Sequence, residues 1–169
     1  MQTLKLLISI VVASLLMAAC AGATGGSGTT ALEFKSTGGT YRVQASAGWK
    51  LSEPMMGYSS VVTNENDINI LVLMTNPDST TLNSYTNPRE MTAANGKKIM
   101  VYNQPAGFTM TSTVNGIKFE AADTLSLLVP IGDNSYLVGV SPATTRKLDD
   151  ALTKQIVDMV GTMELVAAK

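Results

Sequence analysis

The chain has 169 residues, of which 45% are hydrophobic and 15% charged, and its formal net charge is -1. A chain this close to neutrality lacks the basic surface that binds nucleic acid. It contains no histidine and one cysteine, which excludes catalytic triads that need an imidazole, most zinc sites and any disulfide within the chain.

Residues 1–19 have the features of a bacterial signal peptide. One cation, Lys5, precedes an uncharged apolar run that ends at Met17. This run of about a dozen residues is shorter than the roughly 20 that cross a bilayer as a helix. Residues 17–20, Met-Ala-Ala-Cys, resemble the lipobox of bacterial lipoproteins, although Met17 replaces the commoner Leu. The resemblance implies cleavage before Cys20 and acylation of Cys20.

Two other interpretations of this segment stay open. One is an ordinary secretory signal peptide that leaves Cys20 as a free thiol, and the other is an uncleaved membrane anchor. A free thiol is a liability in an oxidising compartment, so lipidation is favoured. Ala21 stands where an aspartate would resemble an inner-membrane retention signal, which slightly favours the outer membrane. Residues 20–31 form the lipidated cysteine and a small-residue tether.

Residues 32–169 are expected to form a single domain, whose first part is predicted to be strands. Tyr41, Val43 and Ala45 alternate with polar residues, which indicates a half-buried strand after a Gly38-Gly39 turn. Residues 32–35 would pair back on it as a hairpin. Further strands are predicted over 59–62 and 68–74, separated by a turn at 64–67, and the apolar second strand is expected to be covered on both faces.

A broken helical crossover is predicted over residues 79–95. A short helix over 80–86 would be capped by Asp78 or Ser79, with Leu82 and Tyr85 facing inward. Pro88 would interrupt it. Residues 87–90, Asn-Pro-Arg-Glu, resemble a second helix start, and residues 95–96, Asn-Gly, a helix end.

The remainder is predicted to be a meander of strands followed by a helix. Strands over 108–114 and 117–129 flank an Asn-Gly turn, and a turn at 132–134 leads to a strand with alternating Tyr136, Val138 and Val140. Apolar residues at helical spacing predict a C-terminal helix, ended by Gly161 and followed by a short strand over 163–166. They are Leu148, Leu152, Ile156, Met159 and Val160.

The predicted fold class is α+β with an antiparallel sheet, because most connections are hairpins. Residues 32–166 resemble the PsbP-like fold and bacterial lipoproteins of the DcrB type. The landmarks are Tyr41 with Gly48-Trp49, Leu82 with Tyr85, residues 114–116 and the amphipathic last helix. The resemblance implies a sheet with helices on both faces, and a family of binding or assembly accessories with no catalytic motif.

Several acidic and amide residues are functional candidates, and each also has a structural explanation. Residues 64–69 place oxygen ligands at alternate positions, as a calcium site would, but lack the glycine and distant glutamate of an EF-hand, so a polar turn is favoured. Asp149 and Asp150 are adjacent on the predicted helix and would not converge. Asp123 shares the alternation of an apolar strand, for which a bulge is the favoured explanation.

Aromatic and sulfur side chains were weighed in the same way. Trp49, with Tyr41 and Tyr58, could line an apolar pocket, but a core tryptophan is favoured. Among the ten methionines, only Met55 and Met56 are adjacent, while Met110 and Met159 are expected to fill the core.

These observations predict a lipid-anchored cell-envelope protein that acts as a non-catalytic binding or assembly accessory. The alternative is a small-ligand carrier, and the third hypothesis is an enzyme that uses Asp123 or a serine. No metal and no cofactor are expected. The expected partners are the membrane, through the lipid on Cys20, and a membrane-proximal envelope protein, while nucleic acid is not expected. The identity of the partner and the oligomeric state stay open.

Overall fold

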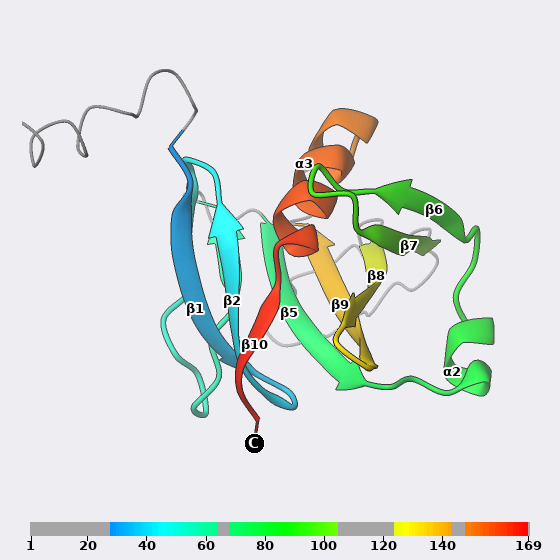
Figure 1. Ribbon diagram of the computed structural model, residues 1–169, viewed down its shortest axis with the longest axis horizontal. Coiled ribbons are helices and arrows are strands. Elements are labelled where there is room, and N and C mark those ends of the chain that lie inside the picture. The colour runs from blue at the N-terminus through cyan, green and yellow to red at the C-terminus, as the bar shows by residue number, and fades with distance from the viewer. Residues whose placement is uncertain (1–27, 64–67, 105–123, 143–147, 169) are drawn as a thin grey trace, which may run out of the picture.

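The computed structural model describes residues 28–63, 68–104, 124–142 and 148–168. The chain in these ranges is mostly strand, with two helices (Figure 1). The elements are β1 Thr30–Ser36, β2 Gly39–Ala45, β3 Trp49–Leu51, β4 Val61–Thr63, β5 Ile68–Thr75, α2 Ser79–Asn83, β6 Arg89–Thr92, β7 Lys98–Gln104, β8 Thr124–Ile131, β9 Asn134–Pro142, α3 Asp150–Gly161 and β10 Glu164–Ala168.

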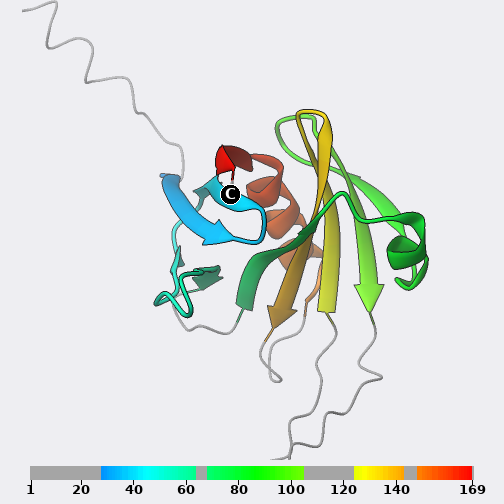
Figure 2. The same ribbon diagram turned by 90° about the horizontal axis from the view of Figure 1, so that it is seen from below.

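The strands form two sheets. The small sheet has the order β1-β2-β10, and the large sheet has the order β3-β4-β5-β9-β8-β7-β6. Every described pair is antiparallel. Figures 1 and 2 show the small sheet at the end of the molecule opposite to β6 and α2.

The core lies between one face of the large sheet and a second layer made of the small sheet and α3. Helix α3 contacts β2 of the small sheet and β6, β7 and β8 of the large one. The largest fully buried side chains come from both layers. They include Phe34, Tyr41, Ile68, Ile70, Ile99, Leu127, Leu137, Ile156 and Met163.

The N-terminal hairpin is confirmed. Leu32 pairs with Val43 in the antiparallel β1–β2 register, and Tyr41, Val43 and Ala45 are buried as their alternation predicts. Gly38 adopts φ 86°, where an added Cβ would lie 2.8 Å from the Tyr41 hydroxyl. Only glycine fits this turn without strain.

The predicted burial of β5 on both faces is only partly correct. Ile68, Ile70 and Val72 are buried, whereas Leu71 is half-buried and Leu73 is 38% exposed. Side chains alternate between the faces of a strand. The buried residues share the core with the small sheet and α3, so these two elements cover only one face of β5.

Of the two helices predicted over residues 79–95, the first is confirmed and the second is wrong. The short helix exists as α2, capped by Asp78, whose carboxylate accepts a hydrogen bond from Thr81 N. The second helix does not form, because Arg89–Thr92 is strand β6, paired with β7. Residues 95–96 belong to the turn of this hairpin, closed by Ala93 N donating to Lys97 O. Strand β7 is not predicted from the sequence.

The strands β8 and β9 are confirmed where the structure describes them. Leu125, Leu127 and Val129 are buried on one face of β8, and a turn at Gly132 leads to β9. In β9 the side chains of Tyr136, Val138 and Val140 are buried as predicted. The predicted strand 108–114 and its Asn-Gly turn lie outside the described residues.

The C-terminal helix is confirmed as α3, in which the predicted apolar residues Leu152, Ile156, Met159 and Val160 are buried. Leu148 precedes the helix and is half-buried, and Asp149 is the N-cap. The predicted end of the helix at Gly161 is confirmed, because Gly161 is its last residue and Thr162 is the C-cap. A Cβ on Gly161 would lie 2.4 Å from the Ala93 Cβ. Glycine is therefore needed there for close packing of α3 on the β6–β7 hairpin, and not for a left-handed turn.

The antiparallel sheet of the predicted fold class is confirmed. The expected sandwich with helices on both faces does not describe the molecule, because the second layer contains a three-stranded sheet. Of the two described helices, only α3 has buried residues. Strand β10, predicted as a short terminal strand, pairs with β2 and completes that sheet.

Candidate functional site

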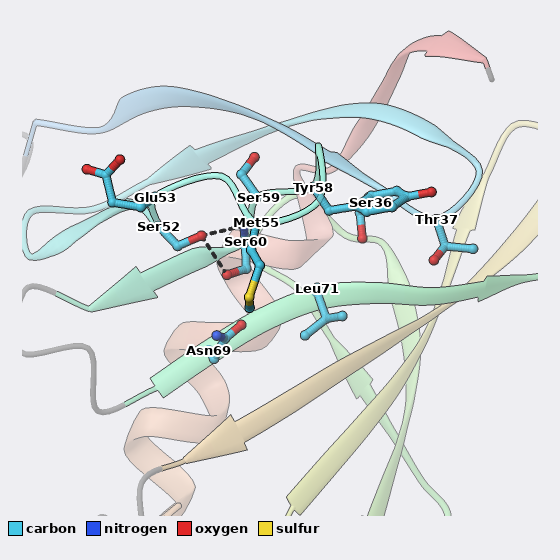
Figure 3. A pocket seen from close by; sticks show the side chains of 10 residues that line it. All are labelled: Ser36, Thr37, Ser52, Glu53, Met55, Tyr58, Ser59, Ser60, Asn69 and Leu71. Atoms are coloured by element: carbon cyan, nitrogen blue, oxygen red, sulfur yellow. Dashed lines mark hydrogen bonds between the residues drawn. The ribbon is translucent and has the colours of Figure 1, made fainter.

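A pocket of about 370 Å³ lies where the small sheet meets the edge of the large sheet. Its walls come from the end of β1, from residues 52–60 between β3 and β4, and from β5 (Figure 3). Residues 52–60 are called the overhang below. Because these segments are distant in the chain, the pocket exists only in the folded domain.

A hydroxyl group joins β1 to β5 beside the pocket. Ser36 Oγ donates to Val72 O at 2.9 Å and accepts from Val72 N at 3.1 Å. The buried Ser36 side chain thus makes the two hydrogen bonds to Val72 that a paired strand would otherwise make at this part of the β5 edge. It holds the two sheets at the spacing that forms the pocket.

Two further sets of hydrogen bonds hold the overhang. Ser59 N donates to Lys35 O at 2.8 Å, which attaches the overhang to β1. Ser60 N and Ser60 Oγ both donate to Ser52 Oγ, at 3.0 and 3.1 Å. The Ser52 and Ser60 hydroxyls therefore bind each other, and no histidine exists in the chain to activate either of them.

Tyr41 supports the pocket from the core side. Its hydroxyl donates to Thr37 O at 2.6 Å, and Thr37 lines the pocket. Burial raises the pKa of Tyr41, and the nearby Tyr136 raises it further. The phenol therefore stays protonated and remains a hydrogen-bond donor at neutral pH.

The floor of the pocket is the face of β5 that the core does not cover. Asn69 and Leu71 line it, and the Met55 side chain points from the overhang toward this strand (Figure 3). Asn69 Oδ1 is buried and has no hydrogen-bond partner among the described residues. A buried acceptor without a donor costs about 1–3 kcal/mol. A ligand or water with an N–H or O–H group would relieve this cost.

Glu53 is the one carboxylate that lines this pocket, and its side chain is exposed. Figure 3 shows Glu53 at the opposite end of the pocket from Tyr58. The pocket therefore presents hydroxyl and amide groups, an apolar floor and a single charge near its rim. This lining suits binding of an uncharged or weakly charged group.

A second hollow of about 470 Å³ lies between β2 and α3, next to Thr29. Its polar groups bind one another: Lys154 Nζ donates to Asp158 Oδ2 at 2.6 Å, and Gln155 Nε2 donates to Ser46 Oγ at 3.0 Å. These groups need no ligand to complete their hydrogen bonds, so the first pocket is the stronger candidate.

The structure separates the three aromatic residues that were weighed as one pocket. Trp49 is 8% exposed and belongs to the core, and Tyr41 is fully buried. Tyr58 alone lines the pocket. The core role favoured for Trp49 is confirmed, and so is the core role of Met159.

The aspartate pair is structural. Asp149 caps α3 by accepting from Leu152 N at 2.8 Å. Asp150 forms an ion pair with Arg89 NH1 at 3.2 Å. The two carboxylates therefore act on different partners, as their spacing on a helix predicts.

The other candidates fall outside the described part of the chain: Cys20, Asp123, Met110 and residues 64–67 of the calcium hypothesis. Within residues 28–63, 68–104, 124–142 and 148–168, no group of three histidine, cysteine or acidic residues could hold a metal ion. No helix in these ranges is both long and apolar enough to span a membrane.

Three serines of the pocket, Ser36, Ser52 and Ser60, are not predicted from the sequence, and Asn69 is predicted only as part of the calcium hypothesis over residues 64–69. One signal was available, because Asn69 is the polar residue within the apolar run from Ile68 to Met74. The serines carry no such signal, since their roles depend on partners 8 and 36 residues away.

Comparison with known protein families, with characterised proteins and with solved structures gives no match to this chain.

Proposed function

We propose that this chain is a lipid-anchored cell-envelope protein that acts as a non-catalytic binding or assembly accessory near the membrane. The lipobox-like residues 17–20 support the anchor, with Cys20 as the acylated residue and the outer membrane slightly favoured. The proposal keeps the PsbP-like, DcrB-type resemblance for the antiparallel sheet and the amphipathic α3 alone, because a three-stranded sheet lies in the layer where the resemblance implies helices.

The pocket beneath the overhang is the observation that carries the binding role. It combines an apolar side chain at Leu71 with hydroxyl groups and a buried acceptor at Asn69 that has no partner among the described residues. The hydroxyls of Ser52 and Ser60 bind each other, and the Glu53 carboxylate is exposed at the rim. This arrangement offers contacts to a bound group and lacks a paired nucleophile and base.

Site-specific cross-linking tests the binding role. A photoreactive amino acid at Glu53, on the rim, is irradiated in intact cells that express the full chain. We expect a discrete cross-linked adduct, and none from the same probe at Asp133, an exposed turn residue outside the pocket. Equal cross-linking at both positions, or at neither, would contradict a binding role for this face.

The anchor is tested separately by mass spectrometry of the mature N-terminus. We expect an acylated Cys20, and we expect Cys20→Ser to leave an unprocessed or misrouted protein. An unmodified Cys20 thiol would contradict the lipoprotein proposal and would leave the cross-linking result unaffected.

A small-ligand carrier is the second candidate, favoured by the volume of the pocket and by Asn69 Oδ1, which accepts no hydrogen bond from the described part of the chain. Native mass spectrometry of the full chain in detergent would show a retained small molecule. Leu71→Trp should fill the pocket and abolish retention, whereas Val166→Trp, at an exposed position of β10, should not. A chain that carries no mass beyond its acyl chains would exclude this candidate.

A further inference from the structure

The overhang ends in a tight two-residue turn. Met55 N donates to Tyr58 O at 2.8 Å, and Tyr58 N donates to Met55 O at 3.0 Å. Between them, Met56 has φ 53° and Gly57 has φ 79°. Two successive positive φ angles define the type I′ turn of β-hairpins. Residues 55–58 are called the tip below.

The tip exposes apolar side chains to an unusual degree. Met56 is 94% exposed and Met55 is 76% exposed, and both Tyr58 and the nearby Leu51 are more than a third exposed. Single exposed apolar residues are ordinary, but a cluster at the end of a projecting hairpin indicates a contact surface. Of the six large apolar residues exposed in the described ranges, four belong to this hairpin.

The backbone of the tip gives an independent reason to infer a function. Position 56 requires the left-handed conformation, which Asn, Asp and Gly adopt readily and methionine does not. Methionine is therefore unfavourable there both for the turn and for solubility. Local strain of this kind is found preferentially at functional sites.

We propose that Met56, at the end of the tip, inserts into the interfacial layer of the lipid bilayer to which the chain is anchored, while Met55 and Tyr58, which also line the pocket, lie at its headgroup level. This inference rests on the lipid anchor of the proposed function. Methionine and tyrosine suit the interface, because the aliphatic chain enters the acyl region while the phenol stays at headgroup level.

The geometry allows the anchor and the tip to reach one membrane. The tether from Cys20 to Thr30 spans about 35 Å when extended. Ser59 N donates to Lys35 O, so the overhang attaches near the far end of β1, about 17 Å from Thr30 along the strand. Since the tether is longer than this separation, the domain can turn its tip toward the bilayer.

A bilayer fits this tip better than a protein partner does. A stable protein interface buries about 800 Å² on each side, which a four-residue turn cannot supply, whereas lipid imposes no requirement of shape. Lys35 and Lys50 are exposed beside the overhang, and Glu53 is its single carboxylate. The two cations suit an anionic headgroup layer.

Spin labelling of the reconstituted chain tests the proposal. The full chain is placed in vesicles of phosphatidylethanolamine and phosphatidylglycerol, with a nitroxide on Met56→Cys or, as control, on Asn83→Cys. Asn83 is exposed in α2, at the opposite end of the molecule from the small sheet. We expect a water-soluble nickel chelate to reach the label at 56 several-fold less than the label at 83, and dissolved oxygen to reach it more.

A second pair of variants keeps the test independent of the label at 56. A nitroxide on Glu53→Cys, two residues before the tip, should be partly shielded from the nickel chelate by the bilayer. The double change Met55→Ser and Met56→Asn should remove this shielding. Asn is favoured in this turn, so the hairpin should still form. Equal accessibility with and without the two methionines would overturn the proposal.

The remaining outcomes separate this inference from the proposed function. An acylated Cys20 takes no thiol label, so labelling of the otherwise unaltered chain would show that the anchor is absent. An unlabelled Cys20 together with a water-exposed label at 56 would overturn the tip insertion alone. Protection at 56 in native membranes but not in lipid vesicles would also overturn it and would indicate a protein partner.

Discussion

At the scale of single residues, the backbone conformation of Met56 predicts an effect on stability that is separate from membrane binding. Its φ of 53° places a methionine where asparagine is preferred. We expect Met56→Asn to raise the free energy of unfolding by about 1 kcal/mol, because the left-handed backbone is less strained with asparagine. Chemical denaturation of the full chain in detergent measures this difference. A lower stability would show that the methionine side chain makes stabilising contacts in the isolated protein.

Asp78 makes a prediction about pH. Thr81 N donates to its carboxylate, and this hydrogen bond lowers the pKa of Asp78 below its ordinary value of 3.8. A carboxyl group with a depressed pKa in the folded state stabilises the fold above the unfolded pKa, and this contribution disappears as the pH falls through the folded pKa. We expect the stability difference between the chain and Asp78→Ala to be full near neutral pH and to shrink as the pH falls below the ordinary pKa of 3.8 and through the lower folded-state pKa. A difference that does not change with pH would show that the ionised carboxylate is not the cap.

At the scale of elements, the packing of α3 predicts that replacing Gly161 with alanine lowers the stability of the domain, whereas this replacement usually stabilises a helix. Alanine is normally favoured over glycine in a helix by about 1 kcal/mol. Here the added Cβ would lie 2.4 Å from the Ala93 Cβ. We therefore expect Gly161→Ala to destabilise the domain by about 1–3 kcal/mol.

The same substitution made together with Ala93→Gly serves as the control. Removing the Ala93 methyl group should relieve the overlap and recover most of the loss, as a double-mutant cycle would show. If the two changes are additive, the contact between α3 and the β6–β7 hairpin does not limit packing.

The elements also show where local signals are ambiguous. The dipeptide Asn95-Gly96 suits both a helix end and a hairpin turn. Because it follows Asn87-Pro88, a possible helix start, the sequence predicts that Asn95-Gly96 ends a helix. In the structure Asn87 adopts φ 50°, and Met91 pairs with Ile99 across the β6–β7 hairpin. Residues 89–92 form a strand because they pair with β7. The hydrogen bonds of this pairing stabilise the strand more than the weak local helix signals would stabilise a helix.

At the scale of the whole molecule, Ser36 connects the two sheets. Its hydroxyl satisfies both Val72 N and Val72 O. We expect Ser36→Ala to lower the free energy of unfolding by about 1–3 kcal/mol, because both backbone groups lose their partner in a buried place. Ser84→Ala, which removes an exposed hydroxyl bonded to Thr81 O, should stay within about 0.5 kcal/mol.

The effect of the Ser36 hydrogen bonds on binding can be measured as well. Ser36 lines the pocket, so loosening of β1 from β5 should also reduce cross-linking from the probe at Glu53. A stable Ser36→Ala chain with unchanged cross-linking would show that the pocket does not depend on this link.

Local features of the fold can be predicted from the sequence alone. Alternation identified β2, β8 and β9, and the spacing of apolar residues identified α3 and its buried face. These features depend on periodicity and capping within a few residues, which the chain carries locally. Only the tertiary structure shows that β6 is a strand, that the small sheet and α3 cover one face of β5, and that the other face forms the floor of a pocket. Each of these depends on a partner distant in the chain, such as Val72 for Ser36, and a hydroxyl carries no local sign of the strand it will join.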